Sequence, residues 1–327
     1  MPNRREFLAA TALSTLAVAS ARANPVATSD LHQHTLEQGN LKVTIGDNTA
    51  TPVHRPGYNG IWDLTHSTLP RSIFVPGIAG LNLEHSITGV ALSNDDQFFE
   101  PRRAEMQLRE LASGQLELYQ PPTPHTHVES WTVFQCSGDS YLDMFFRCRI
   151  HGGPFPYDYL ALFWASYINA PEDKSMYFLG TLDGKTEQWL QLCTQFHNDQ
   201  STVRHRDDTF EMKFADDGRP ALFKSFSPMR YTKPMFYGII GDLFWGIMFD
   251  RHSGIRFTHS PSGGGFNQET QSSNPAWDFQ FLIEQPELQR EYGFRARSFL
   301  VPRCSRAELL RHFSRWQEQS TNNTSRQ

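Results

Sequence analysis

Residues 157–180 read YDYLALFWASYINAPEDKSMYFLG and consist of two apolar runs separated by a short polar island. In the first run, large side chains occupy both parities, with Leu160, Leu162, Trp164 and Ile168 on one and Tyr159, Ala161, Phe163, Ala165 and Tyr167 on the other. A strand without a polar side is buried on both faces. The first run therefore predicts an interior β-strand, and residues 175–179 predict a second, aromatic strand.

The polar island between these runs carries Asn and Pro turn formers and three charges, Glu172, Asp173 and Lys174. An ordinary solvated hairpin turn is one interpretation, because loops are polar by default. The other is the rim of a site held by two rigid strands. On that second interpretation, Glu172 is a candidate acid or base and Lys174 a candidate substrate-binding residue.

The rest of the chain repeats short aromatic and β-branched runs, with turn formers between them, from residue 41 to residue 301. Such spacing is typical of a β-sandwich. One helix is expected near the C-terminus, where Ser305 and Glu308 form a capping box ahead of an apolar stripe. We predict one all-β domain over residues 41–319, preceded by a polar leader at 24–40 and followed by a flexible tail at 320–327.

The N-terminal segment resembles a twin-arginine export signal, with Arg4 and Arg5 ahead of an apolar stretch at 9–19 and the small residues Ala21 and Ala23 at a cleavage site. The apolar stretch is shorter than the roughly 20 residues of a membrane span. We expect residues 1–23 to be a signal peptide, the mature chain to lack a membrane span, and its location to be periplasmic or secreted.

Charge and motifs exclude several classes of function. Removing residues 1–23 leaves 27 basic and 34 acidic side chains, a net charge of −7, which disfavours nucleic acid as a partner. The four cysteines lack CxxC spacing, and export permits disulfides that the sequence does not pair. GxSxG and HExxH motifs are absent, so serine hydrolase and zincin chemistry are not indicated.

Two aromatic loops have the composition of a sugar site, because rings stack on apolar sugar faces while polar groups bind hydroxyls. The loop at 54–63 contributes Tyr58, Asn59 and Trp62, and a later loop ends at Trp277. The alternative for each tryptophan is a core anchor. We expect these four side chains to bind substrate.

A hairpin is predicted around Gly138 and Asp139, because these two residues form a tight turn between two alternating runs. A two-residue turn would pair Trp131 with Phe146 and Ser130 with Arg147. On the polar face of this hairpin, Arg147 could line a groove, and a solvated ion pair is the alternative.

His125, His127 and Glu129 alternate, so on a strand all three would project to one side and could hold a divalent metal. Prolines immediately before them favour an irregular strand entry with exposed histidines instead. We therefore assign no cofactor and keep a cupin-like metalloenzyme as an alternative.

Four residues beside predicted strand ends are the candidate acids and bases, Glu84, His85, Glu172 and His197. A rigid scaffold can present such loop residues to a ligand, and burial there would raise a carboxyl pKa. We expect them to converge across one cleft.

Over residues 40–302, the aromatic strands, the export signal and the scattered His and Glu resemble the β-supersandwich proteins related to galactose mutarotase. The resemblance implies a large antiparallel β-supersandwich and a carbohydrate partner. The family's His-Pro-Tyr-Phe motif is absent, so its catalytic pair is not transferred. We expect an exported carbohydrate-active protein, a hydrolase or lyase, with a non-catalytic glycan-binding module as the alternative.

Overall fold

The computed structural model describes residues 31–90, 95–153, 155–215 and 221–324. The expected signal peptide, residues 1–23, lies outside them. Within these ranges no helix combines the length and apolarity needed to cross a bilayer.

The strands cover most of the described chain. Their bounds are β1 Gln33–Gln38, β2 Leu41–Gly46, β3 Gly60–His66, β4 Asn82–Ile87, β5 Gln107–Glu110, β6 Leu116–Gln120, β7 Val128–Ser137, β8 Tyr141–Ile150, β9 Tyr159–Ala165, β10 Met176–Thr181, β11 Gln188–Leu192, β12 Thr202–His205, β13 Phe226–Tyr231, β14 Met235–Ile240, β15 Leu243–Phe249, β16 Ile255–Ser260, β17 Phe266–Asn267, β18 Ser272–Ser273, β19 Ala276–Glu284 and β20 Glu291–Pro302. The helices are α1 Asp95–Phe98, α2 Glu100–Arg103, the 3₁₀ helix η1 Leu222–Lys224 and α3 Arg306–Thr324.

One 15-stranded sheet dominates the molecule, in the order β4-β9-β19-β16-β12-β13-β10-β14-β15-β20-β8-β7-β6-β5, with β11 beside β10. Its strand pairs are antiparallel except β12 with β13. A separate three-stranded sheet contains β1, β2 and β3. The all-β prediction with one long C-terminal helix is therefore confirmed.

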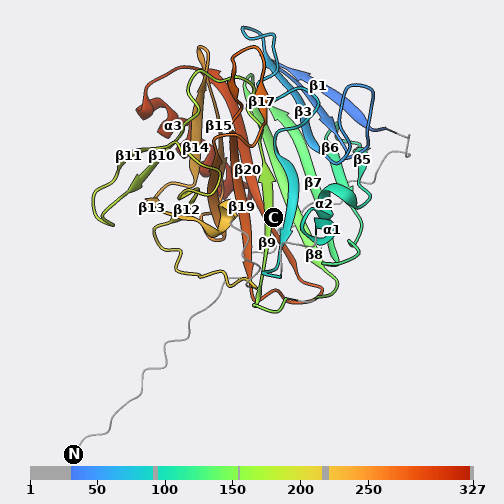
Figure 1. The fold of residues 1–327 in the computed structure, drawn as a ribbon. Coiled ribbons are helices and arrows are strands. Elements are labelled where there is room, and N and C mark those ends of the chain that lie inside the picture. Colours follow the sequence, from blue (N-terminus) through green and yellow to red (C-terminus); the bar gives the residue numbers. More distant parts are fainter. Residues whose placement is uncertain (1–30, 91–94, 154, 216–220, 325–327) are drawn as a thin grey trace, which may run out of the picture.

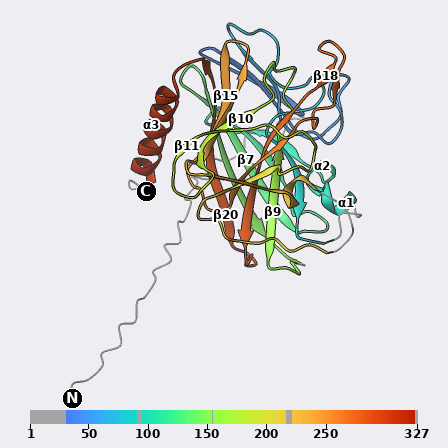
Figure 2. The same ribbon diagram turned by 60° about the vertical axis from the view of Figure 1, so that its left-hand side comes forward.

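The large sheet forms a sandwich because its two halves bury rings against each other. Trp164 of β9 lies 4.7 Å from Phe146 of β8, centroid to centroid, and 5.3 Å from Phe294 of β20. Trp245 of β15 stacks on Trp277 of β19 at 6.0 Å. We call this layer the inter-sheet core. Figures 1 and 2 show α3 on one side of this body and α1 and α2 on the other.

Strand β9 is buried on both faces, as its sequence predicts. One parity, which includes Leu162 and Trp164, joins the inter-sheet core. The other, which includes Phe163, packs with Tyr167 in a second cluster on the outer face. This outer face is where a cleft forms.

The segment after β9 is not a hairpin turn. Strand β9 pairs with β4 and β19, whereas β10 pairs with β11, β13 and β14. Residues 169–174 therefore carry the chain from one part of the sheet to another.

The hairpin of β7 and β8 differs from its predicted register by one residue. Ser137 pairs with Tyr141, so residues 138–140 form a three-residue loop with Gly138 at φ 60°. Backbone bonds from Asn40 to Asp139 and from Leu300 to Ser140 hold this loop. Trp131 consequently pairs with Arg147 and not with Phe146.

Helix α3 begins as its capping box predicts, with the Glu308 N–H donating to Ser305 Oγ at 3.1 Å. It continues to Thr324, so it includes much of the segment expected as a tail. At the other end of the domain, β1 lies inside the expected polar leader and pairs with β2.

Candidate functional site

A cleft of about 360 Å³ opens on the outer face of β4, β9 and β19. The loop at 197–198, the α1–α2 segment and η1 form its other walls. The lining residues are Glu84, His85, Phe98, Phe99, Arg102, Phe163, Ala165, Tyr167, His197, Asn198, Ala221, Leu222, Phe223, Ser260, Gly263, Ala276 and Asp278. Three of the four predicted acids and bases, Glu84, His85 and His197, are among them.

An irregularity in β4 brings two consecutive residues to this face. Leu83 pairs with Trp164 and His85 with Phe163, so the register shifts between them and Glu84 is the extra residue. A bulge of this kind re-aims side chains that would otherwise alternate. Both Glu84 and His85 therefore reach the cleft.

The Glu84 carboxylate is held by two donors on one oxygen. Oε1 accepts from Tyr167 Oη at 2.6 Å and from Arg102 Nη1 at 2.8 Å. Burial raises the pKa of Tyr167 well above its usual range, and Glu84 adds to that rise, so the phenol keeps its proton. Oε2 lies 3.5 Å from Nε2 of His85.

Arg102 is itself fixed behind Glu84. Its Nε donates to Gly57 O at 2.9 Å, and its guanidinium lies 4.0 Å from the centre of the Tyr58 ring. Burial opposes its charge, but Glu84 and the nearby tyrosines raise its pKa. The Glu84–Arg102 pair is thus a preformed element of the wall.

Asp278 supplies a second carboxyl with the opposite character. It is 2% exposed, and its Oδ1 accepts the Ser166 N–H at 2.9 Å. Burial raises the pKa of Asp278 well above its usual range, and the charge of Glu84 raises it further. Consecutive residues, Ser166 and Tyr167, therefore donate to the two carboxyl groups of one cleft.

His85 is a neutral imidazole. Its ring stacks on Phe98 at 3.8 Å and lies 5.3 Å from Phe163. Burial lowers the pKa of His85 to about 4, against the attraction of Glu84.

His197 stands at the mouth of the cleft as an exposed residue of the loop after β11. Its Nδ1 lies 2.8 Å from Oγ of the buried Ser260. Burial of part of the ring lowers its pKa, while the charge of Glu84 opposes that shift.

Glu172, the fourth predicted acid or base, does not join the cleft. It is an exposed residue of the crossover segment. Lys174, from the same segment, donates to Ser272 Oγ at 2.8 Å and Ser273 Oγ at 3.0 Å, away from the cleft lining. Neither side chain lines the cleft.

The aromatic loop at 54–63 supports the cleft from behind. Tyr58 packs edge-on to Tyr167 at 5.8 Å and under Arg102. Asn59 is buried and bonds through its amide to both backbone groups of Leu83, which anchors β4. Trp62 stacks on His54 at 3.8 Å and is buried.

Two further predicted substrate-binding residues lie elsewhere. Trp277 is fully buried in the inter-sheet core, where its Nε1 donates to Lys174 O at 2.8 Å. Arg147 lies on β8 with its guanidinium 3.7 Å from the centre of the Trp131 ring. Trp277 is held in the core, and Arg147 belongs to β8, a strand that contributes no residue to the cleft lining.

The alternative metal-binding set, His125, His127 and Glu129, is not assembled. His127 has a φ of 52°, which breaks the alternation of the strand entry. Both oxygens of Glu129 have other partners, Tyr119 Oη at 2.9 Å and His151 Nε2 at 2.8 Å. In the described part of the chain no group of three or more His, Cys, Asp or Glu is arranged to hold a metal ion.

The four cysteines are all free thiols, two of them buried. Burial raises the pKa of Cys136 to about 11, so that thiol stays protonated. The disulfides that an exported protein could form are not present among them.

Sequence reasoning missed Asp278, Arg102, Tyr167 and Ser260. The parity of β19 carries a usable signal for Asp278, because Trp277 shares its face with Phe279 and Phe281 and that face enters the core. Asp278 must then project to the opposite face, with Ala276. Arg102 lies far from the other groups in sequence, and only the fold brings it to Glu84.

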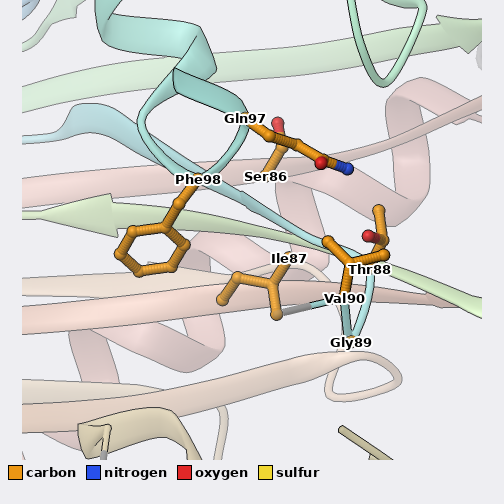
Figure 3. Close-up of a pocket in the computed structure, with 7 residues that line it drawn as sticks. All are labelled: Ser86, Ile87, Thr88, Gly89, Val90, Gln97 and Phe98. Carbon is orange, nitrogen blue, oxygen red and sulfur yellow. The ribbon is translucent and has the colours of Figure 1, made fainter. Parts of the chain in front are cut away.

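A second, much smaller cavity of about 10 Å³ adjoins the cleft. Figure 3 shows its lining, with Phe98 shared between the two spaces and Thr88, Gly89 and Val90 at the far side. A space of this size holds one water molecule. It is therefore too small to be a ligand site.

No family model and no curated protein sequence matches this chain. Similar solved structures exist, and their identities of 9–10% concern the fold alone. A galactose mutarotase related enzyme from Lactobacillus acidophilus has TM-score 0.48 and 9% identity, over 83% of this chain and 100% of that chain. A candidate aldose 1-epimerase from Escherichia coli K12 has TM-score 0.47 and 10% identity, over 83% and 99%. A heparan sulfate lyase mutant from Pedobacter heparinus has TM-score 0.42 and 10% identity, over 88% and 38%.

Proposed function

We propose that this chain is an exported enzyme that hydrolyses glycosidic bonds between uncharged sugar units in the cleft of its β-sandwich. The observation that carries the proposal is the pair of carboxyl groups, Asp278 and Glu84, which line the same cleft in opposite electrostatic environments. Glycosidases use two carboxyls with pKa values held apart, one as proton donor and one as ionised partner.

In this mechanism Asp278 gives its proton to the glycosidic oxygen as the bond from that oxygen to the anomeric carbon breaks. Arg102 and Tyr167 both donate to Oε1 of Glu84. Its Oε2 then accepts the proton of the water that attacks the anomeric carbon. Proton donor and acceptor thus both come from the chain, and no cofactor is assigned.

The lining also suits a sugar ring. Phe98, Phe99 and Phe163 offer apolar surfaces for its C–H faces, and Asn198 offers an amide for its hydroxyls. The volume of about 360 Å³ lies within the range of small-ligand sites.

Charge favours hydrolysis over elimination. A lyase must neutralise the carboxylate of a uronic acid before a base removes the neighbouring proton, and an available cation does this most directly. Among the described lining residues Arg102 is the sole Lys or Arg, and Glu84 already engages it at 2.8 Å. An uncharged sugar is therefore the better fit.

Export is part of the proposal because of the twin-arginine segment at Arg4 and Arg5. A fusion of residues 1–30 to a reporter that functions only after folding in the cytoplasm tests it. Transfer of the reporter to the periplasm through the twin-arginine route is expected. Retention of the reporter in the cytoplasm, or unchanged transfer when Arg4→Lys and Arg5→Lys are combined, would contradict it.

The activity is tested with a panel of neutral and uronic-acid polysaccharides, scored for new reducing ends and for the ultraviolet absorbance of unsaturated products. We expect reducing ends from a neutral glycan without that absorbance. Absorbance on a uronate polymer would establish a lyase instead. Binding without any cleavage would establish a glycan-binding module.

A further inference from the structure

Ser260 is the last residue of β16 and pairs with Ala276 of β19 at the floor of the cleft. It is 1% exposed, so its hydroxyl has little access to water. Its Oγ lies 2.8 Å from Nδ1 of His197 and 3.4 Å from the backbone N–H of Ser262. A buried hydroxyl is normally paired both as donor and as acceptor.

The Ser262 N–H can only donate, so toward that partner Ser260 Oγ is the acceptor. The hydroxyl proton needs an acceptor of its own, and among the described residues Nδ1 of His197 is the one in reach. In a neutral imidazole the nitrogen that accepts carries no proton, and the other nitrogen carries it. The hydrogen bond therefore places the proton of His197 on Nε2.

The loop that carries His197 is tied to the same strand. Ser201 Oγ donates to His197 O at 3.1 Å, and the His259 N–H donates to Ser201 O at 2.9 Å. Among the described residues, partners hold both the backbone carbonyl and Nδ1 of His197, which leaves Nε2 for a ligand in the cleft.

We propose that Ser260 is a positioning residue that fixes His197 as a hydrogen-bond donor to a sugar oxygen rather than as a proton acceptor. This inference rests on the proposed glycan site for its ligand, but the tautomer itself does not depend on the reaction. It assigns proton acceptance in the cleft to Glu84 and leaves His197 to bind and orient. The substrate must then place an oxygen, and not a proton to be removed, at the mouth of the cleft.

The test is the ¹⁵N spectrum of the histidine rings at mildly alkaline pH, where His197→Gln identifies the signals of His197. We expect the Nε2–H tautomer in the wild-type protein. In Ser260→Ala, the shifts should move toward a mixture of tautomers, and Ser260→Thr should restore them. Ser175→Ala removes another buried serine hydroxyl, outside the cleft lining, and should leave the His197 signals unchanged.

An Nδ1–H tautomer in the wild-type protein, or His197 signals that do not respond to Ser260→Ala, would overturn the inference. Once a glycan that the protein hydrolyses has been found, Ser260→Ala should lower kcat/KM for that glycan about tenfold, which corresponds to the net free energy of one hydrogen bond. The spectrum is read without substrate, so a protein that hydrolyses no glycan refutes the proposed function while the tautomer result stands on its own.

Discussion

Two carboxyl groups in one cleft behave differently because their neighbours differ. Glu84 accepts from a guanidinium and a phenol on one oxygen, whereas among the described residues Asp278 accepts from one backbone N–H and pairs with no cation. The desolvation of an ion without a compensating charge favours its protonated form. The division of roles between the two acids therefore originates in Arg102, which stands at Glu84 and not at Asp278.

Asp278→Asn should stabilise the fold at neutral pH, by about 0.5–2 kcal/mol as for other single stabilising changes. The raised pKa of Asp278 means that the folded state holds its proton more tightly than the unfolded state does. Its stability contribution is full below the unfolded pKa and is lost as pH rises through the folded pKa. Urea unfolding near pH 4 and at pH 8 measures this, and an equal effect at both pH values would contradict the account.

His85 should give the unfolding free energy the opposite pH dependence. Its pKa is about 4 in the folded protein and about 6.5 when unfolded. The unfolded state therefore gains a proton first on acidification, and the stability contribution present above pH 6.5 falls by about 3 kcal/mol toward pH 4. His85→Gln should flatten this part of the pH profile of the unfolding free energy. A mutant profile parallel to that of the wild type would show that His85 is not the group responsible.

At the scale of elements, periodicity predicts which face of a strand is buried, but only the paired strands decide what that face meets. The two parities of β9 enter the two clusters as expected, since alternation is a local property. The predicted β7–β8 register is wrong by one residue, because the length of the loop depends on hydrogen bonds from Asn40 and Leu300, far away in sequence. Glu84 and His85 reach the cleft together through a bulge that no local sequence pattern predicts.

Adjacent residues of β19 lie on opposite faces, with Trp277 in the inter-sheet core and Asp278 in the cleft. Trp277→Ala should destabilise the fold by about 3–5 kcal/mol, as for other buried tryptophans, because its ring fills the inter-sheet core. Glycan affinity of the folded fraction should stay the same. Phe98→Ala is the companion variant, expected to weaken glycan binding with less effect on stability. Weakened binding in folded Trp277→Ala with no loss of stability would restore Trp277 as a stacking platform.

At the scale of the molecule, the fold class follows from the sequence, whereas the site depends on how the sheet closes. The order of strands brings β4, β9 and β19 together although they are distant in the chain. Loop position alone therefore nominated both Glu84, which joins the cleft, and Glu172, which stays on the surface. Arg102 and Ser260 complete the site from α2 and β16, elements that no motif connects.

The central claim is that Glu84 and Asp278 together hydrolyse a glycan, and release of reducing ends by matched variants tests it most directly. Glu84→Gln and Asp278→Asn should each lower kcat by about 10²–10⁴-fold, the usual contribution of a positioned acid or base. Glu172→Gln, an equivalent change on the exposed crossover segment, should retain wild-type kcat. Full activity in either cleft variant would contradict the claim.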